Sequence, residues 1–385
     1  ARVCNLSYAQ TDWYIYQQQC PLYNAPGLPI SWNKNQYQEG TNEYVAVRPE
    51  LKKQIEELYR KHPEEARDSF GEDPFEVKNI LKYWVFSEKP EFHVIPTDTI
   101  NIHIDKDALL RSGIMLPKTI RHLKGEDLKD AIPDKLYIPL TDIRMLTKVD
   151  LLMLEMLANC NWERPLYLAI SVGSVSKLKF DNYFVQEGLA FRFTPFDYKK
   201  WGDVGENRLY AVDVERLYDN VMNRYKYGGL DTPGLYLDET TLRTCWYHRR
   251  LFAQLAKELI AQGDNERAKK VLAYAEQVIP GYNVPETHES GSYDIATAYA
   301  ALGEKTKAVT LAVHLIAEAE DYINWAFSLK GNRIEMVRND CIYKFWQWNQ
   351  YNELLKKIDG EKYKESNRRF EEKYALFAPT MNYKN

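Results

Sequence analysis

The sequence predicts an α/β domain with a mixed sheet over residues 1–235, followed by an all-α domain of tetratricopeptide-like (TPR-like) helical repeats over residues 236–385. Two observations carry this prediction. Short apolar runs alternate with helical patterns in the first part, whereas the pattern is helical throughout from about Tyr236. The loop 227–233, which holds two glycines and a proline, marks the change. A chain of 385 residues is also long enough for two cores.

The stretch 147–173 is expected to organise the first domain. Thr147 followed by Asp150 three residues later is typical of a helix start, and the leucine-rich run behind it leaves little polar face. This helix should therefore be packed inside the domain. The almost unbroken apolar run 166–172 suits a strand that is buried on both faces. A buried helix that leads into a buried strand indicates an α/β core.

The other elements of the first domain follow from the same periodicities. Residues 21–32 contain three prolines and a glycine and should form an irregular loop. Pro49 suits the first position of a helix. The expected helices are 12–19, 49–61 and 74–86, and the expected strands are 3–6, 92–95, 99–104, 136–140 and 189–193.

An internal repeat supports the helical domain. Ala256, Gly263 and Ala268 recur forty residues later as Ala296, Gly303 and Ala308. Small residues let two antiparallel helices approach closely, and a glycine closes the turn between them. The spacing exceeds the TPR length of about 34 residues, so the extra length is assigned to the loop 281–289. Helices 333–355 and 361–376 are expected to cap the stack, and docking on the α/β domain to complete its core.

Composition excludes several classes of function. The chain has 51 basic and 55 acidic residues, a net charge of −4, so no nucleic-acid partner is indicated. No apolar run is long enough to cross a bilayer. The five cysteines show no CxxC spacing, which disfavours a disulfide framework or a zinc site. The chain starts at once with an apolar run, and we expect it to be part of something longer.

No catalytic motif is recognisable. The sequence lacks a P-loop, a GxSxG elbow, an HExxH pair and a dinucleotide fingerprint. His93 and His103 flank neighbouring predicted strands, but a shared metal is disfavoured because no histidines pair at ligand spacing. We therefore expect no catalytic residue, no metal and no cofactor.

A few residues are candidates for ligand binding because they lie beside predicted strand ends, where α/β sheets bind ligands. The candidates are Asp12, Trp13, Asn161, Trp162, Arg164, Gly173 and Ser174. Each also has a structural interpretation. Asp12 and Trp13 would be a helix cap beside packed aromatics, Arg164 would pair with a core carboxylate, and the glycine and serine would form an ordinary turn.

Five stretches together resemble one family. They are RVCNLSYAQTDWYI at 2–15, LPISW at 28–32, DLLMLEMLANCNWERPLYLAISVG at 150–173, YFVQEGLAFRFTPF at 183–196, and HRRLFAQLAKELIAQGDNERAKKVL with IPGYNVP within 248–285. The chain resembles the soluble C-terminal part of a family of polytopic membrane proteins from Bacteroidetes. The membrane half of that family is a domain of unknown function related to protein O-mannosyltransferases.

This resemblance implies a non-catalytic module on the periplasmic side of the inner membrane. Its partners would be its own membrane domain and a protein or glycan, recruited through the TPR-like helices. The family's acidic motif matches nothing in this sequence, so no catalytic residue is transferred to it. Two alternatives remain open: a carbohydrate-active enzyme with its site in the α/β domain near Asp12, Asn161 and Gly173, and a scaffold whose helical groove takes a peptide.

Overall fold

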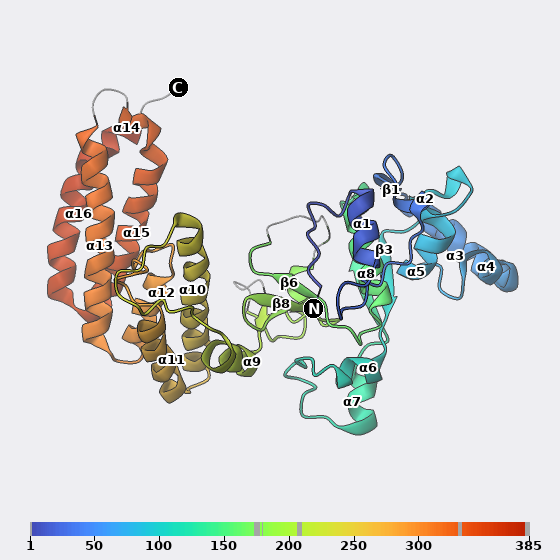
Figure 1. Ribbon diagram of the computed structural model, residues 1–385, viewed down its shortest axis with the longest axis horizontal. Coiled ribbons are helices and arrows are strands. Elements are labelled where there is room, and N and C mark those ends of the chain that lie inside the picture. Colours follow the sequence, from blue (N-terminus) through green and yellow to red (C-terminus); the bar gives the residue numbers. More distant parts are fainter. Residues whose placement is uncertain (1, 173–177, 179, 206–209, 330–332, 382–385) are drawn as a thin grey trace. The chain divides into compact units, whose positions relative to one another are not determined.

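A computed structural model describes residues 2–172, 178, 180–205, 210–329 and 333–381. The chain forms two compact units (Figure 1). The first comprises residues 1–186 and 190–213, and the second comprises residues 187–189 and 214–385. Residues 214–235, which the sequence predicts to belong to the first domain, group with the second unit in this division. An α/β part followed by a helical part is confirmed.

The described residues of the first unit form three small sheets instead of one mixed sheet. β1 pairs in parallel with β2 and antiparallel with β5, with Val45 opposite Leu146. β3 and β4 form a separate antiparallel pair with Ile100 opposite Ile138. The third sheet has the order β6-β8-β7-β9. The strands are β1 (Tyr44–Val47), β2 (Val94–Ile95), β3 (Thr99–His103), β4 (Lys135–Pro139), β5 (Met145–Thr147), β6 (Tyr167–Ala169), β7 (Phe184–Gln186), β8 (Ala190–Phe193) and β9 (Ala211–Val212).

The expected central strand 166–172 is wrong in length and in burial. β6 covers only Tyr167–Ala169 and lies at the edge of its sheet, where β8 is its one partner among the strands that the structure describes. Tyr167 and Ala169 lie on the same face of the strand because side chains alternate, and both are exposed. The apolar run predicts burial on two faces, but this face of β6 is not covered. The expected strand 3–6 is also wrong, since these residues form no strand.

The helix that the sequence placed at the centre is confirmed as α8 (Lys148–Asn159). Thr147 accepts a hydrogen bond from the backbone N–H of Asp150, and the Asp150 carboxylate accepts one from the Thr147 N–H, so the capping box is complete. Besides Asp150, two other charged side chains of α8 are buried. Lys148 pairs with Glu43 at 2.6 Å, and Glu155 accepts hydrogen bonds from the N–H and hydroxyl groups of Ser31. These bonds fix the irregular N-terminal loops on the helix.

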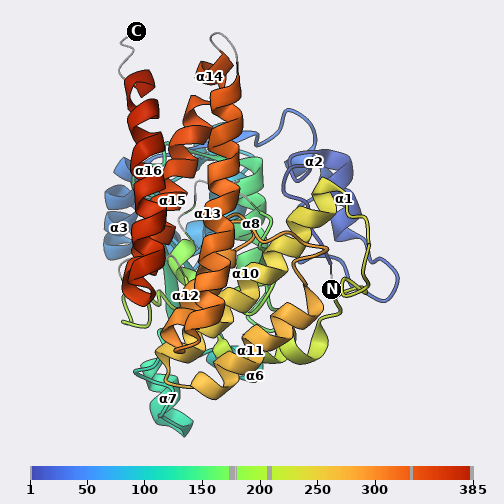
Figure 2. The same cartoon turned by 90° about the vertical axis from the view of Figure 1, so that its left-hand side faces the viewer.

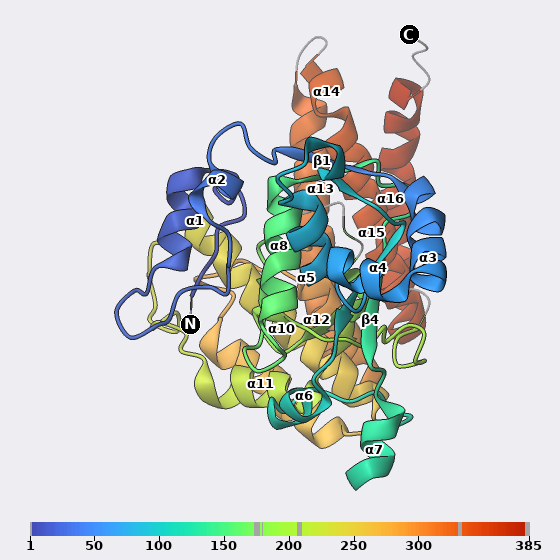
Figure 3. The same ribbon diagram turned by 90° about the vertical axis from the view of Figure 1, so that its right-hand side faces the viewer.

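The remaining helices of the first unit are short and surround α8 and the sheets (Figure 3). They are α1 (Asp12–Gln19), α2 (Lys34–Tyr37), α3 (Lys52–Lys61), α4 (Pro63–Phe70), α5 (Val77–Ile80), α6 (Lys106–Arg111) and α7 (Gly125–Ala131). The helix expected over 74–86 begins later, at Val77, and continues beyond Ile80 as a π-helical turn, Leu81–Val85.

The second unit is helical, and α10 to α13 form two helical hairpins (Figure 2). Gly263 and Gly303 close their turns with φ of +80° and +79°, a region that residues with a side chain rarely adopt. The four alanines of the repeat are fully buried, as close helix packing requires. The helices are α9 (Val214–Asp219), α10 (Glu239–Ala261), α11 (Asn265–Val278), α12 (Ser292–Ala301), α13 (Lys305–Ser328), α14 (Arg333–Met336), α15 (Arg338–Ile358) and α16 (Gly360–Met381).

Arg249 of α10 holds the connection between the two hairpins. Its side chain is 3% exposed. Its guanidinium donates to the backbone carbonyl oxygens of Ile279, Val284 and Pro285 and to the Ser290 hydroxyl, at 2.6–3.1 Å. Burial lowers the pKa of Arg249 to about 10, still far above neutrality. The guanidinium therefore stays charged at neutral pH while it donates hydrogen bonds to the loop 281–289, where the extra length of the repeat was expected.

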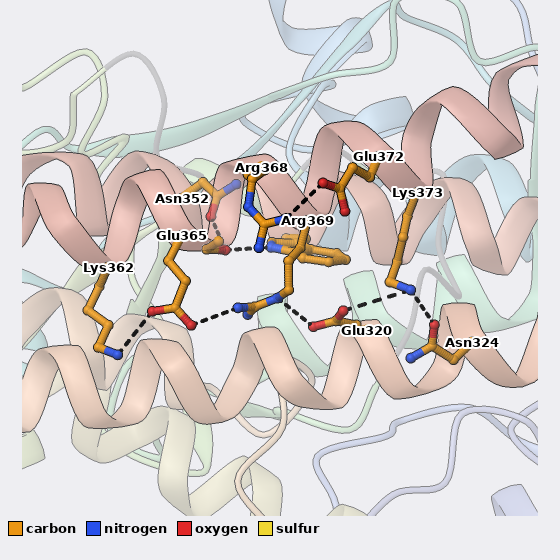
Figure 4. A network of polar contacts seen from close by, with 11 residues as sticks. Glu320, Asn324, Asn352, Lys362, Glu365, Arg368, Arg369, Glu372 and Lys373 are labelled. Atoms are coloured by element: carbon orange, nitrogen blue, oxygen red, sulfur yellow. Dashed lines mark hydrogen bonds and ion pairs between the residues drawn. The ribbon is translucent and has the colours of Figure 1, made fainter.

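The last helices are joined by polar contacts on two levels (Figure 4). On the surface, Arg369 of α16 bonds to Glu320 of α13 at 3.1 Å, and Lys373 donates to Asn324 at 2.6 Å. In the interior, the Trp348 indole N–H donates to the Ser366 hydroxyl, which donates to the Asn352 side chain. Because hydrogen bonds are directional, the buried chain fixes the register of α16 on α15. None of the helices within the described ranges is long and apolar enough to span a membrane.

Candidate functional site

The turn that follows α8 contains the most unusual backbone of the first unit. Asn161 and Trp162 have φ of +48° and +61°, so two successive residues are left-handed. Asparagine tolerates this conformation, but a bulky residue there costs about 1–2 kcal/mol. Trp162 is held in place because it is 7% exposed, its indole N–H donates to the His103 carbonyl at 2.8 Å, and its ring stacks on Phe193. The fold therefore overcomes the backbone cost at this turn.

An open cleft of about 680 Å³ lies at this turn. The end of α8, the end of β3, the beginning of β4 and the residues around the start of α5 contribute to it. Its walls are mostly charged. The lining residues are Asp73, Glu76, Lys78, His103, Ile104, Asp105, Lys106, Asp134, Lys135, Ala158, Asn161, Trp162 and Glu163.

Two of the acids in the cleft are paired with lysines. Lys135 Nζ donates to Asp73 Oδ2 at 2.6 Å, and Lys106 lies 2.7 Å from Asp134. Burial alone would raise the pKa of Asp73, but the hydrogen bonds from Lys135 and from the Phe75 N–H outweigh it and lower that pKa. The hydrogen bond from Lys106 lowers the pKa of Asp134. Both carboxylates are therefore ionised at neutral pH and hold no proton to donate.

Lys78 and Asn161 form a different kind of pair across the cleft. Lys78 Nζ donates to Asn161 Oδ1 at 3.2 Å, and no carboxylate within the described ranges pairs with this lysine. A neutral amide leaves the positive charge of the ammonium uncompensated. Lys78 is exposed, so a ligand with hydroxyl or anionic oxygens can reach it. This arrangement suits the binding of a polar ligand more than proton transfer to one.

The structure brings two of the candidates from the sequence together, Asn161 and Trp162. Arg164 lies on the far side of Trp162, beside a cavity of about 10 Å³ with room for roughly one water molecule. Its Nη1 donates to the Gly27 carbonyl at 2.7 Å, so its hydrogen-bond partner is a backbone oxygen of the N-terminal loop. The structural interpretation expected a core carboxylate in this role.

The other candidates are not part of the described cleft. The Asp12 carboxylate accepts a hydrogen bond from the Trp13 N–H at 2.6 Å, and neither residue lines the cleft. Trp13 is 57% exposed and packs against Tyr8 and Tyr14. Gly173 and Ser174 lie outside the described residues.

Sequence reasoning missed the charged wall of the cleft, to which Asp73, Lys78, Lys106, Asp134 and Lys135 belong. These residues come from segments that are far apart in the chain, and nothing in their local patterns distinguishes them from surface charges. His103 was noted only as a metal candidate. Among the residues that the structure describes, no three His, Cys, Asp or Glu side chains are grouped to hold a metal ion.

Comparison with known proteins identifies one related family. The model of the family described as TMEM260-associated domain 2 matches residues 1–215, more than half of the chain. The matched region contains every residue of the cleft. No curated protein and no solved structure matches the chain.

Proposed function

The chain belongs to the family of TMEM260-associated domain 2, and from this we propose that it is a non-catalytic binding module of a membrane glycosyltransferase resembling protein O-mannosyltransferases. The membrane-embedded part of the protein would carry the polyprenol-linked donor and the catalytic acid. The module would hold the protein or glycan acceptor beside it.

The observation that carries the proposal is the pairing of two of the five acids that line the cleft, Asp73 and Asp134, with lysines. Glycoside hydrolysis commonly requires one carboxylic acid that stays protonated near neutral pH, which means a raised pKa. The pKa values of Asp73 and Asp134 are lowered, because each accepts a hydrogen bond from a lysine. This speaks against Asp73 or Asp134 as the proton donor of a carbohydrate-active enzyme. An exposed ammonium beside an amide is instead a common way to hold hydroxyl or anionic oxygens.

The helical unit supports a role in recruiting partners. Its two helical hairpins have left-handed glycines and buried alanines at the positions of the repeat, an arrangement that TPR-like arrays share. We extend the proposal to a TPR-like array that binds a protein partner and to a position on the periplasmic side of the inner membrane of a Bacteroidetes cell. The resemblance of the sequence motivates these extensions.

The proposal is tested by a binding screen with glycans, acceptor peptides and lipid-linked sugars on the full-length membrane protein and on residues 1–385. We expect both forms to bind the acceptor and only the full-length form to bind the lipid-linked donor. Lys78→Ala should weaken acceptor binding, because it removes the uncompensated cation of the cleft. Lys53→Ala is the matched control, since Lys53 is an exposed lysine of α3 outside the cleft. Donor binding by residues 1–385 alone would overturn the proposal.

A further inference from the structure

The helical unit has a pocket of its own, with a volume of about 230 Å³. It lies between the segment that follows α9 and the last turns of α11. All of its residues are described, and all lie beyond the region that the family match covers. Its lining residues are Met222, Asn223, Tyr225, Lys226, Tyr227, Gly228, Gly229, Asp231, Tyr274 and Val278.

Three tyrosines form a fixed aromatic wall. The Tyr227 ring lies 6.0 Å from that of Tyr274, almost at right angles, and 5.4 Å from that of His248. Its hydroxyl donates to the Val221 carbonyl at 2.6 Å, and burial raises the pKa of Tyr227. Tyr225 is fixed as well, since its hydroxyl accepts the Leu189 N–H at 3.0 Å. The wall therefore needs little reorganisation to receive a ligand.

Other polar groups of the pocket have no partner of their own. Among the described residues, nothing bonds to Lys226 Nζ, to the Asp231 carboxylate or to the Tyr274 hydroxyl. They supply a strong donor, a strong acceptor and a group that can do both. Gly228 and Gly229 also line the pocket, and because glycine has no side chain, this part of the pocket stays open. Unused groups of both signs next to aromatic rings are suited to a small ligand with several hydroxyl groups.

We propose that this pocket binds a single sugar ring, a neutral hexopyranoside. One face of such a ring carries C–H groups that pack on aromatic side chains, and its hydroxyls both donate and accept hydrogen bonds. The volume lies below the roughly 300–1,000 Å³ of sites for drug-sized ligands, which suits one ring. This site goes beyond the proposed function: it uses no residue of the cleft, so either can fail without the other.

The test is saturation-transfer NMR followed by titration of residues 1–385 with methyl α-mannopyranoside, methyl α-glucopyranoside and N-acetylglucosamine. Free phenylalanine serves as a competing ligand, because its ammonium and carboxylate could also meet Asp231 and Lys226. We expect at least one sugar to bind and phenylalanine not to displace it. Lys226→Ala and Asp231→Asn should each weaken binding about tenfold, or ~1.4 kcal/mol, since each removes a charged hydrogen-bonding partner.

Lys257→Ala is the matched control, because Lys257 is an exposed lysine of α10 outside the pocket. Lys226 and Asp231 are exposed, so the variants should fold normally, and circular dichroism checks this. Three results would overturn the assignment: no sugar binds the unaltered chain, phenylalanine displaces the sugar, or the two pocket variants bind as well as the control.

Discussion

Replacing Arg249 by methionine tests whether this buried cation holds the helical hairpins together. Methionine is apolar and flexible enough to fill much of the space, but it leaves four acceptors without their donor. A hydrogen bond from a charged donor contributes about 1.5–3 kcal/mol, and desolvation of the guanidinium, recorded in its lowered pKa, offsets part of the total. We expect a net loss of about 3 kcal/mol in the free energy of unfolding of the helical unit.

The assay is urea unfolding of residues 1–385, followed by circular dichroism at the helical signal. Arg243→Met on the same helix is the control. Arg243 is exposed, and among the described residues it pairs only with Glu239 one turn away, so this change should cost less than about 0.5 kcal/mol. Arg249→Lys should fall between the two, because a lysine keeps the charge but lacks the planar fork. Equal midpoints for the methionine variants at 249 and 243 would refute the reasoning.

Four further changes have defined outcomes. Asp73→Asn should make the free energy of unfolding depend less steeply on pH in acid. The pKa of Asp73 is lowered in the folded state, so the ionised carboxylate stabilises the fold above about pH 4, and this contribution is lost as the pH falls through the folded pKa. Burial lowers the pKa of His248, so the free energy of unfolding should fall as the pH drops below about 6.5. His248→Phe should weaken this pH dependence. For both variants the measurement is unfolding at a series of pH values, and a slope equal to that of the unaltered chain would contradict the expectation. Thr147→Ala should destabilise α8 by about 1 kcal/mol in urea unfolding through loss of the cap, and a neutral effect would argue against the capping box. Gly303→Ala should cost about 1–2 kcal/mol in the same experiment because φ is +79°, whereas no effect would mean that the turn relaxes freely.

The sequence predicted best those structural features that depend on residues close together in the chain. The capping box at Thr147 and Asp150 and the burial of α8 follow from the order of residues within one helix. The glycines at 263 and 303 also mark their turns correctly, because glycine has no Cβ and adopts the left-handed conformation that such turns need at no steric cost. In such cases neighbouring residues decide the structure, and no distant contact is needed.

Features that depend on distant partners were not predictable. The apolar run at 166–172 has the composition of a buried strand, but its exposure depends on which segments pack against its two faces. The charged wall of the cleft contains Asp73, Lys106 and Asp134, which come from three separate segments. No spacing in the sequence indicates that these residues lie close together. The left-handed turn at Asn161 and Trp162 was a candidate site on position alone, and the hydrogen bond to His103 that holds it is also long-range.

The most direct test of the central claim is a turnover assay of residues 1–385 with glycosides, glycopeptides and lipid-linked sugars, run beside the full-length membrane protein. We expect transfer by the full-length protein and none by the chain alone, even where the chain binds the acceptor. Turnover by the chain that disappears in Asp73→Asn or Asp134→Asn would contradict the account, because it would give a catalytic role to carboxylates whose lysine partners keep them ionised.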